Sequence, residues 1–328
     1  MATLKDVAAA AGLNVGTVSR VLNNRGYISE ETRDKVYQVM ERLNYKPNEL
    51  ARSLSKQHTN TIGLIVPHVV HPYFAGVISS IEQEAYDHKY KVLLCASREN
   101  SEREREYIEL CKNNRVDGII LCSATVDSEL FTASKLPVVA FERNIGMGFA
   151  SVECDNLQGG MLAAQHLIEC GCTHLVHMSG LKDTEMPADD RELGFLQECE
   201  RQKVHARAFK TESSLYYQMD YNKFLEQMLR ENPDTDGIFA SSDLIAAQAI
   251  QACSSLGLRV PEDIQLVGFD DVLLARLTSP TITTIRQPVK EMARLAIDEL
   301  IDQIEGRLVP SRTMLPVRLV ERGSTKRL

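Results

Sequence analysis

The sequence contains no tryptophan and no run of about 18 apolar residues, which is the length that a membrane-spanning helix requires. Its first residues include an acid, Asp6, where a signal peptide would need an apolar stretch. We therefore expect a protein that has no membrane contact and stays in the cytoplasm. The eight cysteines form no CxxC pair and none precedes Cys95, so we expect reduced thiols rather than disulfides or a zinc site.

Sequence signatures of common enzyme sites are missing as well. No GxxxxGK[ST] phosphate loop occurs, and Gly146 and Gly148 lack the third glycine of a dinucleotide-binding loop. His68 and His71 are three residues apart, but a zinc site would need further ligands on a helical face. We therefore expect no enzyme, no cofactor and no metal.

The charge of the chain is unevenly divided. Its 328 residues are enough for about two domains, and 25% charged and 44% hydrophobic residues are typical of globular proteins. Residues 1–58 hold nine Lys and Arg against six Asp and Glu, a net charge of +3, whereas the remainder carries −11 of the total of −8. This split indicates a small polyanion-binding module joined to a larger part that avoids polyanions.

The N-terminal segment has the pattern of three short helices. Apolar residues recur at helical spacing from Leu4 to Ala11, and Gly12 then allows the backbone conformation that ends a helix. Asn14 is a favourable N-cap for a second helix over 15–22, and Ser29 is one for a third. The predicted buried residues are Val18, Val21 and Leu22 in the second helix and Val36, Val39, Met40 and Leu43 in the third.

Two short helices joined by a tight turn, with a third packed across them, form a helix-turn-helix. In that motif the outward residues at the start of the second helix face base edges in the major groove of DNA. An ordinary solvated helix face would carry the same residue types, so periodicity alone leaves both interpretations open. The outward residues are Asn14, Val15, Gly16, Thr17, Ser19, Arg20 and Asn23.

The order of the residues in this segment is more specific than their periodicity. The stretches 3–8, 11–12 and 17–23 closely resemble the DNA-binding segment of the LacI/GalR family of bacterial transcription regulators, and the match continues through 32–54 into 61–67. The resemblance implies that operator double-stranded DNA is a partner.

The same resemblance implies roles for single residues of the second helix. Val15 and Gly16 stand at the pair that sets operator specificity in the family. Because glycine has no side chain and valine offers only apolar contact, hydrogen-bonded readout would fall to Arg20, with Asn14, Thr17 and Ser19 as helpers. The residues that resemble phosphate contacts are Thr3, Asn23, Tyr45 and Asn48.

The stretch after Pro47 resembles the hinge helix of the family, which lies in the minor groove of the operator. Leu54 would then be an apolar wedge between base pairs, with Ala51 beside it. Leu50 and Leu54 are equally spaced as the ordinary core of a short helix, so without the resemblance a core role is favoured.

From about residue 60 the sequence alternates short β-rich runs with helical stretches, which predicts parallel α/β sheets covered on both faces. The length favours two lobes rather than one sheet. The predicted strands are 62–66, 92–95, 118–121, 137–141, 174–177, 237–239 and 264–267.

Polar and aromatic residues follow these strands, where ligands bind in open α/β sheets. Carboxylates, amides and arginine suit the hydroxyls of a sugar, and an aromatic ring suits its apolar face. Turns and helix caps use the same residues, so each could also have a purely local role. These residues are His68 to Phe74, Ser123, Glu142-Arg143, Asp155-Asn156, Ser242-Asp243 and Asp270-Asp271.

The second part of the chain also resembles the LacI/GalR family, namely its effector domain, which is similar to the periplasmic sugar-binding fold. Arg191 and Asp270 resemble the principal effector contacts. Ser242 stands where several members carry asparagine, and without tryptophan a tyrosine such as Tyr216, or Phe74, would stack on the ligand. The residues that resemble lesser contacts are Tyr73, Phe74, Ser123, Glu142, Asp155, Ser242 and Gln287.

The expected fold class is a small all-α helix-turn-helix segment joined to an α/β two-lobed domain of the periplasmic-binding-protein type. No leucine heptad follows the last strand, so a homodimer is expected, and a twofold protein implies a pseudo-palindromic operator. The expected domains are a DNA-binding domain over 1–46, a hinge helix and linker over 47–59, and an effector and dimerisation domain over 60–328. Its N-lobe would span about 60–158 and 288–314, and its C-lobe about 159–287 and 315–328.

The sequence therefore predicts a repressor of carbohydrate-utilisation genes that leaves its operator when a sugar binds between the lobes. Two related alternatives stay open, a regulator that responds to a purine-like corepressor and a catabolite regulator that docks a phosphocarrier protein. A remote alternative is a sugar-binding protein without a regulatory role.

Overall fold

The structure is a computed structural model that describes all residues except 1, 24, 46–57, 99, 124–130, 132–135, 147, 180–185, 212 and 327–328. It divides into two compact units, residues 1–59 and residues 60–328, which we call the head and the body. Among the described residues, none of the helices combines the length and the apolar character needed to cross a membrane.

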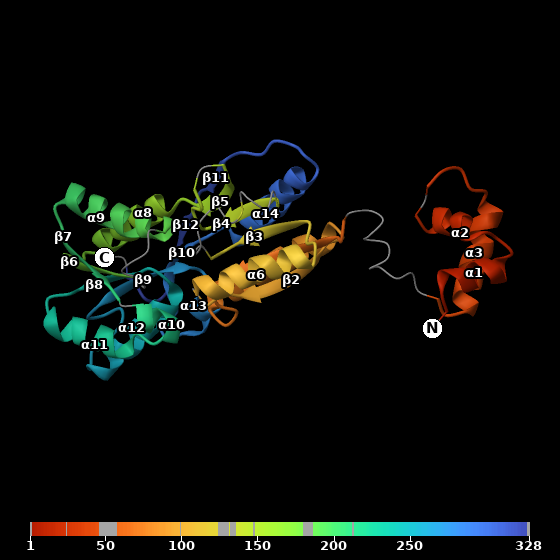
Figure 1. The fold of residues 1–328 in the computed structure, drawn as a ribbon. Helices are drawn as coiled ribbons and strands as arrows, with labels where there is room; N and C mark the ends of the chain where they lie inside the picture. The colour runs from red at the N-terminus through yellow and green to blue at the C-terminus, as the bar shows by residue number, and fades with distance from the viewer. Residues whose placement is uncertain are drawn as a thin grey trace. The chain divides into compact units, whose positions relative to one another are not determined.

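Three helices of the head enclose one small core (Figure 1). Helix α1 (Leu4–Ala11) ends at Gly12 in the left-handed conformation, α2 (Val15–Leu22) has Asn14 as its N-cap, and α3 (Glu30–Arg42) has Ser29. The predicted helices and caps are thus confirmed. The buried core residues are Val7, Ala8, Ala11, Val18, Val21, Val36 and Val39, with Leu22, Met40, Leu43 and Tyr45 partly buried around them.

The body contains two six-stranded sheets with the same strand order (Figure 1). All neighbouring strands are parallel except β12, which runs antiparallel to β10. The first sheet has the order β2 (Lys91–Ala96), β1 (Thr61–Val66), β3 (Gly118–Leu121), β4 (Val138–Phe141), β5 (Ala150–Cys154) and β11 (Arg312–Leu315). The second has the order β7 (His205–Lys210), β6 (His174–Ser179), β8 (Gly237–Ala240), β9 (Gln265–Asp270), β10 (Thr283–Arg286) and β12 (Arg318–Val320).

Helices cover both faces of each sheet. In the first lobe, α5 (Pro72–Asp87) and α14 (Val289–Ile304) pack against each other and the sheet, and α6 (Ser101–Asn113) covers the opposite face. In the second lobe, α8 (Asn156–Glu169) and α9 (Asp190–Gln202) cover one face, and α11 (Asn222–Glu231) and α12 (Asp243–Ser255) the other. Shorter elements are η1 (Pro187–Asp189), α10 (Ser213–Gln218) and α13 (Leu274–Leu277).

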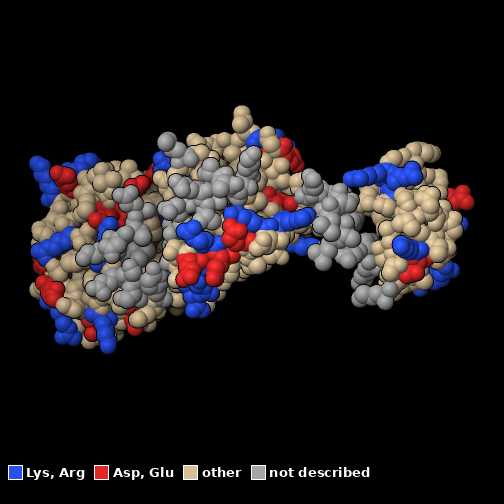
Figure 2. Space-filling view, in the orientation of Figure 1, with Lys and Arg blue, Asp and Glu red and all other residues tan. Residues whose placement is uncertain are grey.

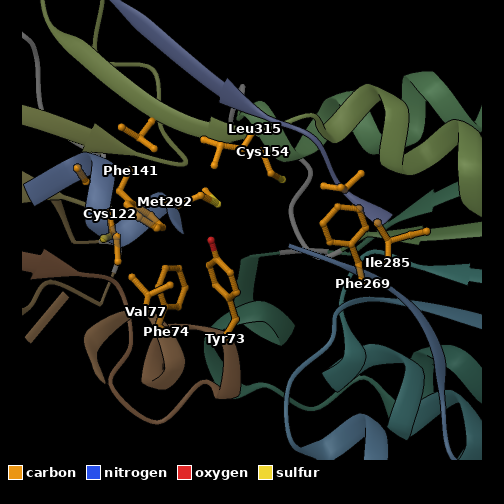
Figure 3. Packing of buried hydrophobic residues seen from close by; sticks show 14 of the residues in the cluster. Tyr73, Phe74, Val77, Cys122, Phe141, Cys154, Phe269, Ile285, Met292 and Leu315 are labelled. Atoms are coloured by element: carbon orange, nitrogen blue, oxygen red, sulfur yellow. The ribbon is translucent and has the colours of Figure 1, made fainter. Parts of the chain in front are cut away.

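The chain passes between the two sheets three times, after β5, after β10 and after β11. One apolar cluster accordingly contains residues of both lobes, as Figure 3 shows for Phe141 and Leu315 of the first sheet and Phe269 and Ile285 of the second. The body forms a cavity whose lining includes residues that end or follow strands of both sheets.

All seven predicted strands are present, and the described residues form five further strands that were not predicted. These five are β5, β7, β10, β11 and β12. Strands β7, β11 and β12 lie at sheet edges, where side chains are exposed to water and the local pattern carries little apolar signal.

Candidate functional site

The exposed start of α2 is the first candidate site. Asn14 Oδ1 accepts hydrogen bonds from the backbone nitrogen of Thr17 at 2.7 Å and from its hydroxyl at 3.0 Å. A Cβ at Gly16 would lie 3.3 Å from the same oxygen, so glycine leaves room for the cap. Val15 is 40% exposed and Arg20 is exposed, so the helix presents one apolar and one cationic side chain to solvent.

The other predicted residues of the head have local bonds as well. Asn23 Nδ2 donates to the Ser19 carbonyl at 2.9 Å, and Thr3 forms a capping box with Asp6. The N–H of Thr3 is the main cause that lowers the pKa of Asp6. Tyr45 packs, partly buried, against the head core. Lys and Arg side chains are visible on the head surface in Figure 2, and Asn48, Ala51 and Leu54 lie outside the described residues.

The second candidate site is a cavity of the body at the carboxyl ends of strands from both sheets. Glu142 follows β4, Ser179 ends β6, and Asp270 ends β9. Tyr73 and Phe74 come from the first turn of α5, and Arg191 from the first turn of α9. The lining residues are His71, Tyr73, Phe74, Glu142, Arg143, Ser179, Met186, Ala188, Asp189, Arg191, Tyr216, Tyr221, Ser241, Ser242, Ile245 and Asp270.

Arg191 is the central cation of this cavity. Its Nε donates to Asn156 Oδ1 and its Nη1 to the Ser241 carbonyl, both at 2.7 Å. The guanidinium carbon lies 3.6 Å from the centroid of the Phe269 ring. This combination of hydrogen bonds and cation–π contact holds the guanidinium in one orientation although it is buried.

Two glycines position the helix that carries Arg191. A Cβ at Gly160 of α8 would lie 2.0 Å from the Arg191 carbonyl oxygen, and a Cβ at Gly194 of α9 would lie 2.0 Å from the Leu157 carbonyl oxygen. Larger residues would therefore force the two helices apart. This close packing fixes the position of α9, and with it the backbone of Arg191, relative to α8.

Two buried carboxylates flank the Arg191 guanidinium. Glu142 Oε2 lies 3.8 Å from Nη2, and Asp270 Oδ1 lies 3.9 Å from Nη1. Glu142 also accepts from the backbone nitrogen of Cys154 and, at 3.1 Å, from Asn156 Nδ2. Burial raises the pKa of Asp270 to about 7, against the opposing effect of Arg191. One cation is thus shared by two carboxylates.

A hydrogen-bonded chain joins the lobes beside this cluster. The Tyr73 hydroxyl donates to Gln287 Oε1 at 3.2 Å, and Gln287 Nε2 donates to Asp270 Oδ1 at 2.7 Å. Tyr73 packs edge-on against Phe74 with ring centroids 5.2 Å apart, and Figure 3 shows both rings on the side of α5 with the Tyr73 hydroxyl directed away from that helix. Burial also raises the pKa of Tyr73, so its hydroxyl stays a donor.

The structure brings most of the predicted effector residues together. Tyr73, Phe74, Glu142, Arg191, Ser242 and Asp270 line the cavity, and Gln287 contacts two of them.

Ser123 and Asp155 have other surroundings and are not among the lining residues. Ser123 is fully buried, donates to Glu104 and bonds to Ser97 at 2.9 Å. Asp155 is the N-cap of α8 and accepts from the backbone nitrogen of Gln158 at 2.9 Å. For Asp155 the local role of a helix cap, which its residue type also suggested, is the one observed.

Sequence reasoning missed several lining residues, among them Ser179, Ser241 and Tyr221. Ser179 and Ser241 directly end or follow strands, so the rule about carboxyl ends could have found them. Tyr221 is the N-cap residue of α11 and gave no such signal. In the described part of the chain no three His, Cys, Asp or Glu side chains gather as metal ligands would.

Comparison with known proteins finds one family model that matches the head and another that matches part of the body. Residues 3–48 match the model of bacterial regulatory proteins of the lacI family, and residues 164–325 match that of the periplasmic binding protein-like domain. The ribose operon repressor of Halalkalibacterium halodurans is 37% identical over 327 residues, covering 99% of this chain and 98% of the relative. The sucrose operon repressor of Streptococcus mutans is 35% identical over 98% of both chains.

Among solved structures, the lac repressor dimer bound to operator and the anti-inducer ONPF is similar to this chain with a TM-score of 0.87. The two sequences are 26% identical, and the similarity covers 98% of each chain. The likeness therefore extends over the head and the body alike.

Proposed function

Because the chain belongs to the lacI family of bacterial regulatory proteins, we propose that it represses carbohydrate-utilisation genes by binding operator DNA. The observation that carries this proposal is that two features occur in the same chain. One is a helix-turn-helix with exposed Val15 and Arg20, and the other is a cavity with a buried Arg191 between two carboxylates. The protein acts in the cytoplasm, as a regulator and not as an enzyme.

In this proposal α2 enters the major groove of the operator. Arg20 donates to base edges, while Val15 contacts a thymine methyl group. Asn14, Thr17 and Ser19 assist, although Asn14 and Thr17 are already bonded to each other as a cap. The proposed backbone contacts are Thr3, Asn23, Tyr45 and Asn48, and the proposed minor-groove contacts are Ala51 and Leu54.

The proposed effector is a sugar that binds in the cavity of the body. Arg191, Asp270 and Glu142 supply donors and acceptors for its hydroxyls, and Phe74 supplies an apolar surface. Tyr73, Ser242 and Gln287 complete the proposed set. Ser123 and Asp155 would join only in another arrangement of the lobes, because their side chains are bonded elsewhere.

Effector binding is proposed to shift the protein between two arrangements of its lobes. The Tyr73–Gln287–Asp270 chain links the first lobe to the second through the cavity wall, so a sugar that competes for Asp270 or Gln287 changes this link. In a homodimer the two first lobes would carry the two hinge segments, and their reorientation would release the operator. Thermodynamic linkage requires operator DNA to weaken sugar binding by the same factor.

The test is the fluorescence anisotropy of a labelled pseudo-palindrome of about 20 base pairs, titrated with the full chain at several salt concentrations. We expect tight binding over scrambled DNA, a steep salt dependence, and release by one member of a panel of sugars. Binding that a purine such as hypoxanthine strengthens would replace induction by corepression. Weak binding with no preference for sequence, on a range of palindromes, would contradict the DNA-binding role.

A further inference from the structure

The charges around the cavity limit what an effector can be. Among the described lining residues, only Arg143 and Arg191 carry a permanent positive charge. Against them stand the carboxylates Glu142 and Asp189, together with Asp270, which is about half ionised at neutral pH because burial raises its pKa to about 7. Burial lowers the pKa of His71 to about 4, so its imidazole adds no positive charge at neutral pH. Among the described residues that line the cavity, positive charges therefore do not outnumber negative charges.

The two arginines of the wall are already bonded to protein groups. Arg191 donates to Asn156 and Ser241 and lies between Glu142 and Asp270. Arg143 Nη1 donates to the Glu142 carbonyl at 2.9 Å. An anionic ligand would have to draw a guanidinium away from these partners.

A third cation, Lys210, stands behind the wall and is paired as well. Its Nζ lies 3.1 Å from Asp189 Oδ1 and 3.4 Å from Glu192 Oε2. Of these residues, Asp189 lines the cavity and Lys210 does not. A ligand in the cavity would therefore contact the Asp189 carboxylate rather than the Lys210 ammonium.

The helix starts at the cavity are acidic too. Helix N-termini attract anions through their free N–H groups, but α9 has Asp190 and Glu192 in its first turn. Helix α12 begins with Asp243, whose fully buried carboxyl group accepts from the Thr284 hydroxyl at 2.6 Å and from the backbone nitrogen of Val272 at 2.8 Å; burial raises its pKa, so we count no charge there. A phosphate at the start of α9 would face the carboxylates of that helix.

Neutral hydroxyl groups suit the wall better. The Ser179 hydroxyl is buried at the end of β6 and has no hydrogen-bond partner among the residues that the structure describes, and Ser179 lines the cavity. A buried hydroxyl without a partner costs free energy, which a ligand hydroxyl would recover. Glu142, Asp270 and the Ser241-Ser242 pair are further acceptors around the same space.

The two ligand classes therefore have opposite energetic consequences. Removing one partner of a buried ion pair is strongly unfavourable, and a phosphate that captured Arg191 would leave Glu142 and Asp270 without their shared cation. A neutral sugar leaves the ion pairs in place and needs only hydrogen bonds. Resting on the proposed sugar effector, we infer that the effector is an uncharged polyhydroxyl compound and that its phosphate esters are excluded.

The experiment compares matched ligands on the full chain by isothermal titration calorimetry at pH 7.5. The pairs are D-ribose with ribose 5-phosphate, D-fructose with fructose 6-phosphate, and sucrose with sucrose 6-phosphate, and hypoxanthine is added as a neutral base. We expect one neutral sugar to bind, with its ester weaker by about 100-fold or more, as the loss of one buried ion pair implies. An ester that binds as tightly as its sugar, or more tightly, overturns the inference and leaves a sugar effector in place.

Two other outcomes affect the proposal differently. Binding of hypoxanthine alone keeps the ligand neutral but removes the polyhydroxyl class, and so contradicts the inference together with the sugar effector. If none of these ligands binds and none changes operator affinity, the sugar effector itself fails, and the inference fails with it. DNA binding is measured separately, so the role of the head is judged independently.

Two variants test the physical cause. Asp189→Asn removes the carboxylate between the cavity and Lys210. We therefore expect the ratio of sugar affinity to ester affinity to decrease several-fold. The matched control is Asp298→Asn on the outer helix α14, which makes the same charge change at an exposed pair and should leave the difference unchanged. Ser179→Ala should weaken the neutral sugar by about 3- to 10-fold, because it removes one hydrogen bond. If Asp189→Asn behaves like its control, carboxylate repulsion is not the cause.

Discussion

The head and the body hold their arginines in different ways. In the head, Arg20 lies exposed on a helix whose inner face belongs to a core of seven buried apolar residues. In the body, Arg191 is buried, and hydrogen bonds, two carboxylates and an aromatic ring fix it. The head therefore depends on apolar packing for its fold and leaves the Arg20 side chain exposed to a partner. In the body the same polar side chains serve the fold and the cavity, so function and stability are coupled there.

Arg191→Ala should destabilise the body and leave the stability of the head unchanged. Without the guanidinium, Glu142 and Asp270 stay buried without a cation, so we expect a loss of about 4 kcal/mol in the free energy of unfolding. Urea unfolding followed by circular dichroism measures this loss, and anisotropy should show that sugar no longer changes operator binding. Arg294→Ala, which removes an exposed ion pair on α14, is the control and should cost less than about 1 kcal/mol. Equal losses in the two variants would contradict the coupling.

Asp270 should make the stability of the body fall as the pH rises. The carboxyl ionises near pH 3.8 in the unfolded chain but keeps its proton to about pH 7 in the folded body, because burial disfavours the charge. Between these values the folded state binds one more proton, so the free energy of unfolding decreases by up to about 1.4 kcal/mol per pH unit. Unfolding of the wild type and Asp270→Asn between pH 4.5 and 7.5 measures this slope, and the variant should lack it.

The head should respond to pH in the opposite direction. Hydrogen bonds from Thr3 lower the pKa of Asp6, so its contribution to stability is present at neutral pH and is lost as the pH falls below the ordinary value of 3.8. If Asp270→Asn kept the slope of the wild type between pH 4.5 and 7.5, a group other than Asp270 would cause the pH dependence of the body.

Two valines of α2 allow the stability of the head and its contact with DNA to be tested separately. Val18 is fully buried and Val15 is 40% exposed. Val18→Ala should lower the stability of the head by about 2 kcal/mol, through lost burial and a cavity, and a unit this small would then unfold readily. Val15→Ala should change stability by less than about 0.5 kcal/mol but alter which operators are bound. Hydrogen exchange of the full chain, with operator anisotropy, distinguishes the two, and sugar affinity should be equal in both.

Arg20→Ala should have the smallest effect on stability and still weaken the operator complex. A lost contact to a base edge costs about 1–3 kcal/mol and reduces the preference for the right sequence. Arg42→Ala removes the same charge from the end of α3 and should weaken binding to operator and scrambled DNA alike. Anisotropy on both DNAs tests this difference. A uniform loss from Arg20→Ala would assign Arg20 to the phosphate backbone.

The strands that could be predicted are those made of consecutive apolar residues, such as β1 and β3, because such a run indicates a buried strand. Strand β5 was missed because it contains Glu153, which is buried and paired with Arg312 of β11, a residue far along the chain. Strand β10 begins with two threonines that are fully buried, and the partners of their polar groups include Ser324 and Asp243. A local window sees such residues as polar, because the compensating partner comes from another strand or helix.

The candidate site was predictable where a residue's role depends on its position after a strand or on the family resemblance. Arg191 and Asp270 were found in this way and lie together. Ser123 and Asp155 have residue types that also satisfy local needs, a buried hydrogen bond to Glu104 and a helix cap, and only three-dimensional contacts reveal which need is met. The close approach of α8 and α9 at Gly160 and Gly194 has no signal in composition, because glycine has many uses.

The three crossings between the sheets have a consequence for synthesis on the ribosome. The three described helices of the head have been made once about 45 residues have emerged, and the residues of their apolar core all lie within this stretch. Each sheet of the body, in contrast, receives a strand from residues 312–320, so neither lobe is complete until the chain is nearly finished. A nascent chain interrupted before that point would carry a finished head on an unfinished body, which is a DNA-binding module without the means to respond to its signal.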